Sequence, residues 1–147
     1  MTRKLDSTDW RIVKELMADG SLTNVALAGK VGLSAPPSLR RVRALEEAGV
    51  ITGYTALVDE RALGFDLTAF AMVGLHKQAE ADLRAFENRI LGWPIVREAY
   101  MLSGESDYIL KCVTRDLPAF QEFILKELTA VPNVASVKTT LTIRRAK

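Results

Sequence analysis

Residues 33–49 read L-S-A-P-P-S-L-R-R-V-R-A-L-E-E-A-G, a pattern that predicts a short helix. Ser34 suits the N-cap position, since its hydroxyl oxygen can accept a hydrogen bond from a free backbone N–H of the first turn. Pro36 and Pro37 then fall in that first turn, where a missing N–H costs little. Gly49 ends the helix, because glycine readily takes the left-handed conformation that follows a last turn.

This predicted helix has one apolar face and a basic outer surface. The apolar positions recur at helical spacing, and they are Leu39, Val42 and Leu45. An α-helix fits the major groove of B-DNA, and arginine side chains bind phosphates or guanine edges. We therefore predict that the residues contacting DNA are Ser34, Pro36, Pro37, Ser38, Arg40, Arg41 and Arg43. Taken alone, the same surface is equally typical of a solvated charged helix.

The residues on either side of this helix favour the DNA-binding interpretation. Residues 23–31 predict a second short helix that is capped by Thr23 and closed by Gly32. A tight turn between two such helices is the helix-turn-helix arrangement. An earlier helix begins at Asp6 or Ser7, and its apolar side is expected to hold Trp10, Ile12, Val13, Leu16 and Met17. Residues 51–58 predict a small hairpin, so residues 1–58 are expected to form a winged helix-turn-helix domain.

Composition limits the classes of protein that this chain can belong to. The 147 residues are 48% hydrophobic, which is enough for a packed core. No apolar run is long enough to span a membrane, and the start of the chain lacks the apolar core of a signal peptide. Cys112 is the only cysteine, so we expect no internal disulfide and no cysteine-based metal site. No cofactor and no other metal site are expected either. A cytoplasmic, nucleoid-associated location is the simplest expectation.

The net charge of +2 is small, but it is unevenly distributed. The first 52 residues hold 8 basic and 6 acidic residues, whereas the remaining residues hold 12 of each. All of the excess positive charge therefore lies in the first third of the chain. This distribution suits a DNA-binding domain attached to a neutral body.

The second part of the chain predicts an α+β domain. Residues 59–66 are polar and contain a glycine, and we interpret them as a linker. From residue 67 onward the pattern reads strand, helix, strand, strand, helix, strand, with the last strand at 134–143. This βαββαβ order is the ferredoxin-like pattern, with an antiparallel sheet that carries its helices on one face. Residues 67–147 are therefore expected to form the second domain.

The open face of such a sheet needs a covering partner. We expect apolar or small residues there, at alternate positions of residues 69–75 and 137–143. Burial of that face against a second copy is favourable at about 25 cal/mol per Å² of apolar area. The sequence thus predicts at least a homodimer, which presents two DNA-binding helices to a roughly symmetric site.

Several stretches together resemble the Lrp/AsnC family, the feast/famine regulators of bacteria and archaea. They run from the first helix to the last strand and are L-D-S-T-D-W-R-I-V (5–13), L-T-N-V-A-L-A-G-K-V-G-L-S (22–34), R-R-V-R-A-L-E-E-A-G-V-I-T-G-Y-T-A-L-V-D (40–59), S-G-E-S-D-Y-I-L-K (103–111) and V-P-N-V-A-S-V-K-T (131–139). The resemblance implies an amino-acid-sensing second domain and dimers that assemble into octamers of four dimers. The start of the DNA-binding helix departs from the commoner S-P-x-x-x form, so the DNA sequence is not carried over.

The resemblance also implies where an effector binds. The family's site gathers around a G-x-x-D-Y turn and the last strand of a neighbouring subunit, and here the turn is Gly104 to Tyr108. Gly104 would allow close backbone approach, and Asp107 would accept from an α-ammonium group or anchor the turn. The implied effector-binding residues are Tyr100, Leu102, Gly104, Asp107, Thr140, Leu141 and Thr142. Two alternatives to effector binding remain. Asp107 could be a turn residue that bonds its own backbone, and the threonines could be present because threonine favours strands.

No catalytic constellation is found. His76 is the only histidine, and no nucleophile elbow, zinc-protease motif or phosphate-binding loop is present. We therefore expect a regulator that binds double-stranded DNA and responds to a small molecule, most simply an amino acid. The alternatives are an architectural DNA-wrapping protein without an effector, a small enzyme built on the second domain, and a sensor whose helix-turn-helix binds protein.

Overall fold

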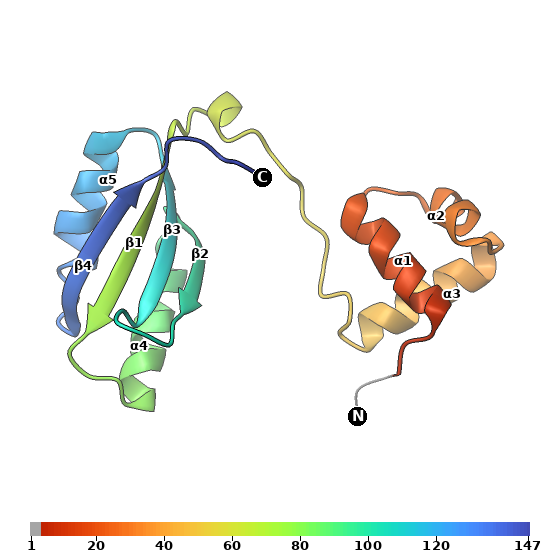
Figure 1. The fold of residues 1–147 in the computed structure, drawn as a ribbon, viewed down its shortest axis with the longest axis horizontal. Helices are drawn as coiled ribbons and strands as arrows, with labels where there is room; N and C mark the ends of the chain where they lie inside the picture. The colour runs from red at the N-terminus through yellow and green to blue at the C-terminus, as the bar shows by residue number, and fades with distance from the viewer. Residues whose placement is uncertain (1–3) are drawn as a thin grey trace. The chain divides into compact units, whose positions relative to one another are not determined.

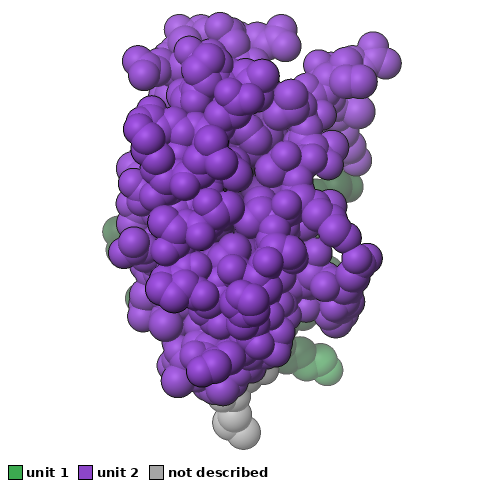
Figure 2. Space-filling model, turned by 90° about the vertical axis from the view of Figure 1, so that its left-hand side faces the viewer, with its two compact units in different colours: residues 1–58 green, residues 59–147 purple. Residues whose placement is uncertain are grey.

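A computed structural model describes residues 4–147, which form two compact units that separate after Val58 (Figures 1 and 2). The first three residues of the expected DNA-binding domain, Arg3 included, lie outside the described residues. None of the described helices is both long enough and apolar enough to cross a membrane.

The first unit contains three helices: α1 (Ser7–Ala18), α2 (Asn24–Val31) and α3 (Ala35–Glu47). Thr23 caps α2 by accepting a 3.2 Å bond from the Ala26 N–H. Gly32 follows in the left-handed conformation, with φ at 72°, and so turns the chain sharply into α3. The buried core of the three helices consists of Ile12, Leu27, Val31 and Leu45. The predicted helix-turn-helix is confirmed.

The predicted cap of α3 is wrong in its chemistry. Ser34 occupies the N-cap position, yet its side chain makes no capping hydrogen bond. A capping oxygen accepts from the N–H of the second or third helical residue. Those residues are Pro36 and Pro37, and neither has an N–H. The prolines therefore fix the first turn through their restricted φ angles and leave the Ser34 hydroxyl available at the exposed end of the helix.

Two expectations about the apolar residues and the wing of the first unit are wrong. Trp10 and Met17 are 62% and 83% exposed, because they lie roughly 140–160° around α1 from the buried Ile12.

Residues 51–58 contain no strand, so the expected hairpin is absent from the described part of the chain. An isolated two-stranded hairpin is marginal in water, and Leu57, 89% exposed, packs on nothing within its own unit.

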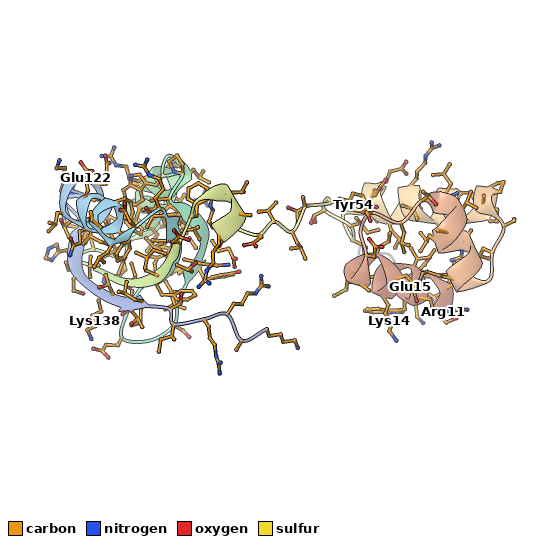
Figure 3. All side chains as sticks on the ribbon, turned by 90° about the horizontal axis from the view of Figure 1, so that it is seen from above. Arg11, Lys14, Glu15, Tyr54, Glu122 and Lys138 are labelled. Carbon is orange, nitrogen blue, oxygen red and sulfur yellow. The ribbon has the colours of Figure 1, made fainter. Side chains whose placement is uncertain are left out.

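The segment after α3 contacts the helices of the first unit. Ile51 packs against the apolar core, and its N–H donates to the Leu45 carbonyl at 3.2 Å. Tyr54, which is labelled in Figure 3, donates a 2.9 Å hydrogen bond from its hydroxyl to Glu46 on α3. Beyond it, the expected linker contains a short 3₁₀ helix, η1 (Arg61–Leu63), which ends at Gly64 with φ at 82°. The linker is thus partly ordered.

The second unit confirms the βαββαβ order. Its elements are β1 (Leu67–Leu75), α4 (Glu80–Leu91), β2 (Val96–Met101), β3 (Tyr108–Thr114), α5 (Leu117–Phe123), a π-helical turn η2 (Ile124–Leu128) and β4 (Val134–Leu141). The strands form one antiparallel sheet in the order β2-β3-β1-β4. Helices α4 and α5 cover one face of it (Figure 1). In Figure 3, Glu122 of α5 lies on the helix side and Lys138 of β4 on the opposite side.

The register of β1 separates the two faces of the sheet. Ala69, Ala71, Val73 and Leu75 face the helices and are buried with Phe86, Trp93, Tyr108, Leu110, Phe120, Phe123 and Leu128. Phe70 and Met72 therefore face the open side, next to Ile109 of β3. All three are half-buried, as expected for an apolar open face. The expectation for β4 is wrong, because its register with β1 puts Lys138 and Thr140 on that face.

Cys112 lies at the centre of the second unit's core. Its side chain is fully buried, and burial raises the pKa of the thiol to about 12. Burial therefore keeps the thiol protonated, and the thiol is unreactive because the thiolate is the reactive form.

We expect native protein to resist thiol alkylation at about pH 8. Alkylation in denaturant, where the thiol pKa is ordinary, should be faster by roughly a thousandfold or more. Mass spectrometry of samples quenched over time measures both rates. Rapid modification of the native chain would show that the core opens at Cys112.

Candidate functional site

The exposed face of α3 carries two arginines without intramolecular partners. Pro36, Arg40 and Arg43 follow one another at helical spacing of four and three residues, and all three are exposed. Within the described residues, neither Arg40 nor Arg43 forms an ion pair or a hydrogen bond through its side chain. A stripe of free guanidinium groups on a helix can bind phosphates or base edges.

Arg41 does not lie free on this surface, which corrects the expectation for that residue. Its Nη1 atom donates to Asp6 Oδ2 at 2.7 Å and to Asp9 Oδ1 at 2.8 Å, both at the start of α1. The hydrogen bond to Asp6, followed by the one to Asp9, raises the pKa of Arg41. The pKa of Asp6 is lowered, chiefly by its hydrogen bond from the Asp9 N–H and then by the bond from Arg41.

Ser38 also differs from the sequence-based expectation. It is completely buried between the helices, so the prediction that it lies on the outer surface is wrong. Residue 38 is one turn before Val42 and two turns before Leu45, which places it on the apolar side of α3. Its Oγ has no hydrogen-bond partner in the described part of the chain. Ser34 is exposed and Pro37 is half-buried.

In the second unit, Asp107 fastens the β2–β3 turn to β1. The Leu75 N–H donates to Asp107 Oδ2 at 2.6 Å, and the Asp107 N–H donates to the Val73 carbonyl at 2.9 Å. The Leu102 N–H in turn donates to the Asp107 carbonyl at 2.8 Å. The carboxylate thus bonds a neighbouring strand, not its own turn, so Asp107 anchors the loop that contains Gly104.

Gly104 lies in this turn, and nothing within the second unit requires a glycine at this position. Its φ is not in the left-handed region, and a Cβ built on it would meet no atom within 4 Å. Glu105, next to it, accepts a 2.6 Å bond from Lys138 of β4. The backbone of the turn is therefore open to approach from outside.

Tyr100 and Leu102 lie next to the same turn, at the end of β2. The Tyr100 hydroxyl donates to Glu98 at 2.9 Å, and that carboxylate also accepts a 2.8 Å bond from Lys111. The hydrogen bond to Glu98 is the main cause that raises the pKa of Tyr100. Tyr100 is 59% exposed and Leu102 is 36% exposed, so both offer surface to a ligand or a second chain.

The remaining residues of the predicted effector site lie farther along the sheet, beside the start of β1. Thr140 pairs with Phe70, Leu141 pairs with Ala69, and the Thr142 hydroxyl donates to the Thr68 carbonyl at 2.8 Å. Asp107 instead meets β1 at Val73 and Leu75. Along β1, Phe70 and Val73 are three residues apart and Thr68 and Leu75 are seven residues apart, so at about 3.3 Å per residue the two groups are separated by roughly 10 to 23 Å. One copy of the chain does not bring them together.

Two features were not found from the sequence. Asp6 and Asp9 are more than thirty residues from Arg41, and their spacing signals only a helix start. A cleft of about 470 Å³ also lies between the end of α4 and α5, lined by Arg89, Trp93, Glu122, Phe123 and Glu127 among others. Helix-layer clefts of this kind depend on loop geometry, which local periodicity does not encode.

Comparisons with known proteins agree with this geometry. Residues 68–147 match the Lrp/AsnC ligand binding domain, and residues 5–52 match a winged helix-turn-helix DNA-binding family. The chain belongs to the Lrp/AsnC family. It is 58% identical to the leucine-responsive regulatory protein of Rhizobium meliloti, over 98% of this chain and 92% of that protein. This Lrp/AsnC protein is therefore a DNA-binding transcriptional regulator with a ligand-binding domain, and not an enzyme.

Further relatives of this Lrp/AsnC regulator are similar over their whole length. The Bkd operon transcriptional regulator of Pseudomonas aeruginosa is 42% identical, over 96% of this chain and 92% of the relative. The solved complex of a Neisseria meningitidis transcriptional regulator with L-Met has a TM-score of 0.91 at 34% identity. That comparison covers 98% of this chain and 93% of the other.

We expect Asp107→Ala to destabilise the ligand-binding domain of this regulator by about 1.5–3 kcal/mol, because the Leu75 N–H loses a charged acceptor. Asp107→Asn keeps an acceptor oxygen and should lose less. Urea unfolding measures both variants in a Trp10→Phe background, where Trp93 is the only tryptophan and reports on this domain. Equal stability of Asp107→Ala and the parent chain would contradict an anchoring role.

Proposed function

We propose that this regulator binds DNA through the exposed face of α3 and that an amino acid alters this binding from the second domain. The observation that carries the proposal is the pair of free guanidinium groups at Arg40 and Arg43 on a helix-turn-helix. Pro36 lies one turn before Arg40 and is exposed, Ser34 is exposed at the N-cap, and Pro37 is half-buried. These residues are the proposed DNA contacts.

An amino acid is the proposed effector. The solved Neisseria relative holds L-Met, and the most similar relative described above is named for its response to leucine. The open backbone at Gly104 suits close approach by a small ligand. Asp107 would accept from the α-ammonium group through the carboxylate oxygen that does not bind Leu75. Tyr100 and Leu102 are the proposed walls of the site.

Assembly is part of the proposal, because the two groups of effector-binding residues lie apart along one sheet. A site that contains both needs Thr140, Leu141 and Thr142 from a second copy. The half-buried Phe70, Met72 and Ile109 on the open face provide apolar area for pairing two copies. We propose a homodimer that presents two α3 helices, and four such dimers as the larger assembly.

The effector would act at a distance from the DNA. A ligand shifts an equilibrium only by its different affinity for two states, so the amino acid must favour one arrangement of copies over another. DNA binding and effector binding are then reciprocally coupled, and each must change the measured affinity of the other.

We expect Arg40→Gln and Arg43→Gln each to weaken DNA binding and its dependence on salt. Each lost phosphate contact should reduce the slope of log affinity against log salt by about 0.9. The probe is a short duplex that the full-length protein selects from a random-sequence pool, measured by fluorescence anisotropy. Lys77→Gln in the second domain serves as a control for net charge. Slopes that do not change in either α3 variant would overturn the proposed contacts.

We expect at least one of the twenty amino acids to bind and to raise the melting temperature of the protein, since a ligand of the native state stabilises it. Calorimetric titration of each amino acid into the full-length chain measures the affinity, and size-exclusion chromatography measures the assembly. Gly104→Thr should abolish binding without unfolding the domain, because its side chain meets open space within the chain. No binding by any amino acid would favour the architectural DNA-wrapping alternative.

A further inference from the structure

A cluster of three charged side chains joins the DNA-binding helix to the start of α1. One nitrogen of Arg41, in the middle of α3, donates to Asp6 at 2.7 Å and to Asp9 at 2.8 Å. The Asp9 side chain is only 2% exposed, whereas the Arg41 side chain is 30% exposed and that of Asp6 is 53% exposed. Among the described residues of this unit, the carboxylate of Asp9 is thus the most deeply buried charged group, and it is in direct contact with the side chain of Arg41.

Each carboxylate divides its two oxygens between the cap of α1 and Arg41. Asp6 Oδ1 accepts from the Asp9 N–H at 2.8 Å, and Asp9 Oδ2 accepts from the Asp6 N–H at 3.3 Å, which together form a capping box. The other oxygen of each carboxylate binds Arg41. The start of α1 and the middle of α3 are thus held by one continuous network of hydrogen bonds.

This network also limits the orientation of α3. Adjacent residues of a helix are rotated by about 100° from each other, so Arg41 cannot share a direction with Arg40. While Arg41 faces α1, Arg40 and Arg43 face solvent. Movement of Arg41 toward DNA would break both of its hydrogen bonds, including the one to the buried carboxylate of Asp9, and removal of a cation from beside a buried carboxylate is unfavourable.

We propose that Arg41 is a positioning residue, which uses Asp6 and Asp9 to set the orientation of α3 and does not itself contact DNA. The inference rests on the proposed DNA contacts of Arg40 and Arg43. Of three arginines within four residues, Arg40 and Arg43 then bind DNA and Arg41 orients the helix. The carboxylate of Asp6 then supports DNA binding, although its charge repels the phosphates.

The first test compares the salt dependence of DNA binding for Arg41→Gln and Arg40→Gln, in the full-length protein and with the selected duplex. We expect both variants to lose about tenfold or more in affinity at moderate salt. Only Arg40→Gln should reduce the salt slope, by about 0.9 for each lost phosphate contact. An equal reduction of the slope in Arg41→Gln would show that Arg41 binds phosphate and would overturn the inference.

The second test uses Asp6→Asn, for which electrostatics and positioning predict opposite signs. Asparagine caps helices about as well as aspartate, so α1 should remain folded. If the charge of Asp6 acts on DNA only through repulsion, this variant binds more tightly than the parent chain. If Asp6 holds Arg41 in place, the variant binds several-fold more weakly with the parent salt slope. Tighter binding would overturn the inference even if Arg41→Gln does not fold.

Two controls separate the possible failures. Melting curves followed by circular dichroism show whether each variant is folded at the assay temperature, and Arg41→Lys should recover part of the lost affinity by restoring a cation beside Asp9. Absence of DNA binding by the parent chain would refute the proposed function itself. Normal binding by the parent together with a reduced slope for Arg41→Gln would refute only the positioning role.

Discussion

The carboxylate of Asp9 is almost completely removed from water, and the DNA-binding unit is organised around that charge. A buried ion must be paired and hydrogen-bonded to be tolerated, and here the partners come from two helices. Arg41 satisfies the charge from α3, while the backbone N–H of Asp6 satisfies it from the start of α1. The apolar core of Ile12, Leu27, Val31 and Leu45 holds the helices together through non-directional packing. The polar network adds directional hydrogen bonds between the start of α1 and the middle of α3.

In the ligand-binding domain the corresponding constraint is the register of β1. This central strand pairs with β3 on one side and β4 on the other, and its odd-numbered residues complete the core. The same register leaves Phe70 and Met72 on the open face and keeps the Gly104 turn far from the end of β4. Because a sheet is stiff along its strands, the two halves of the proposed site cannot close on each other. In the proposed assembly, a second copy supplies the other half of the site and covers the open face.

Several features followed from local sequence alone. The three helices of the first unit, the βαββαβ order and the left-handed glycine at position 32 depend on periodicity, capping and turn chemistry within a few residues. The Arg40 and Arg43 side chains were also assigned to an exposed surface on spacing alone, and they lie there. The wrong prediction of a capping hydrogen bond at Ser34 also has a cause in the neighbouring sequence, because Pro36 and Pro37 lack the N–H groups that a cap needs.

Other features depended on parts of the chain that are distant in sequence. The partners of Arg41 lie 32 and 35 residues away, so helical spacing could not distinguish it from Arg40. The burial of Ser38 depends on which side of α3 packs against the other helices. The exposure of Trp10 depends on how much of the surface of α1 packs against α2 and α3. The hydrogen bond from the Leu75 N–H to Asp107 depends on the pairing of strands in the sheet, which brings these two residues together. Sequence determined the elements and their order, because those follow from interactions along the chain. The tertiary structure alone determined which charged side chains are free to bind, because burial and ion pairing arise only when separate elements meet.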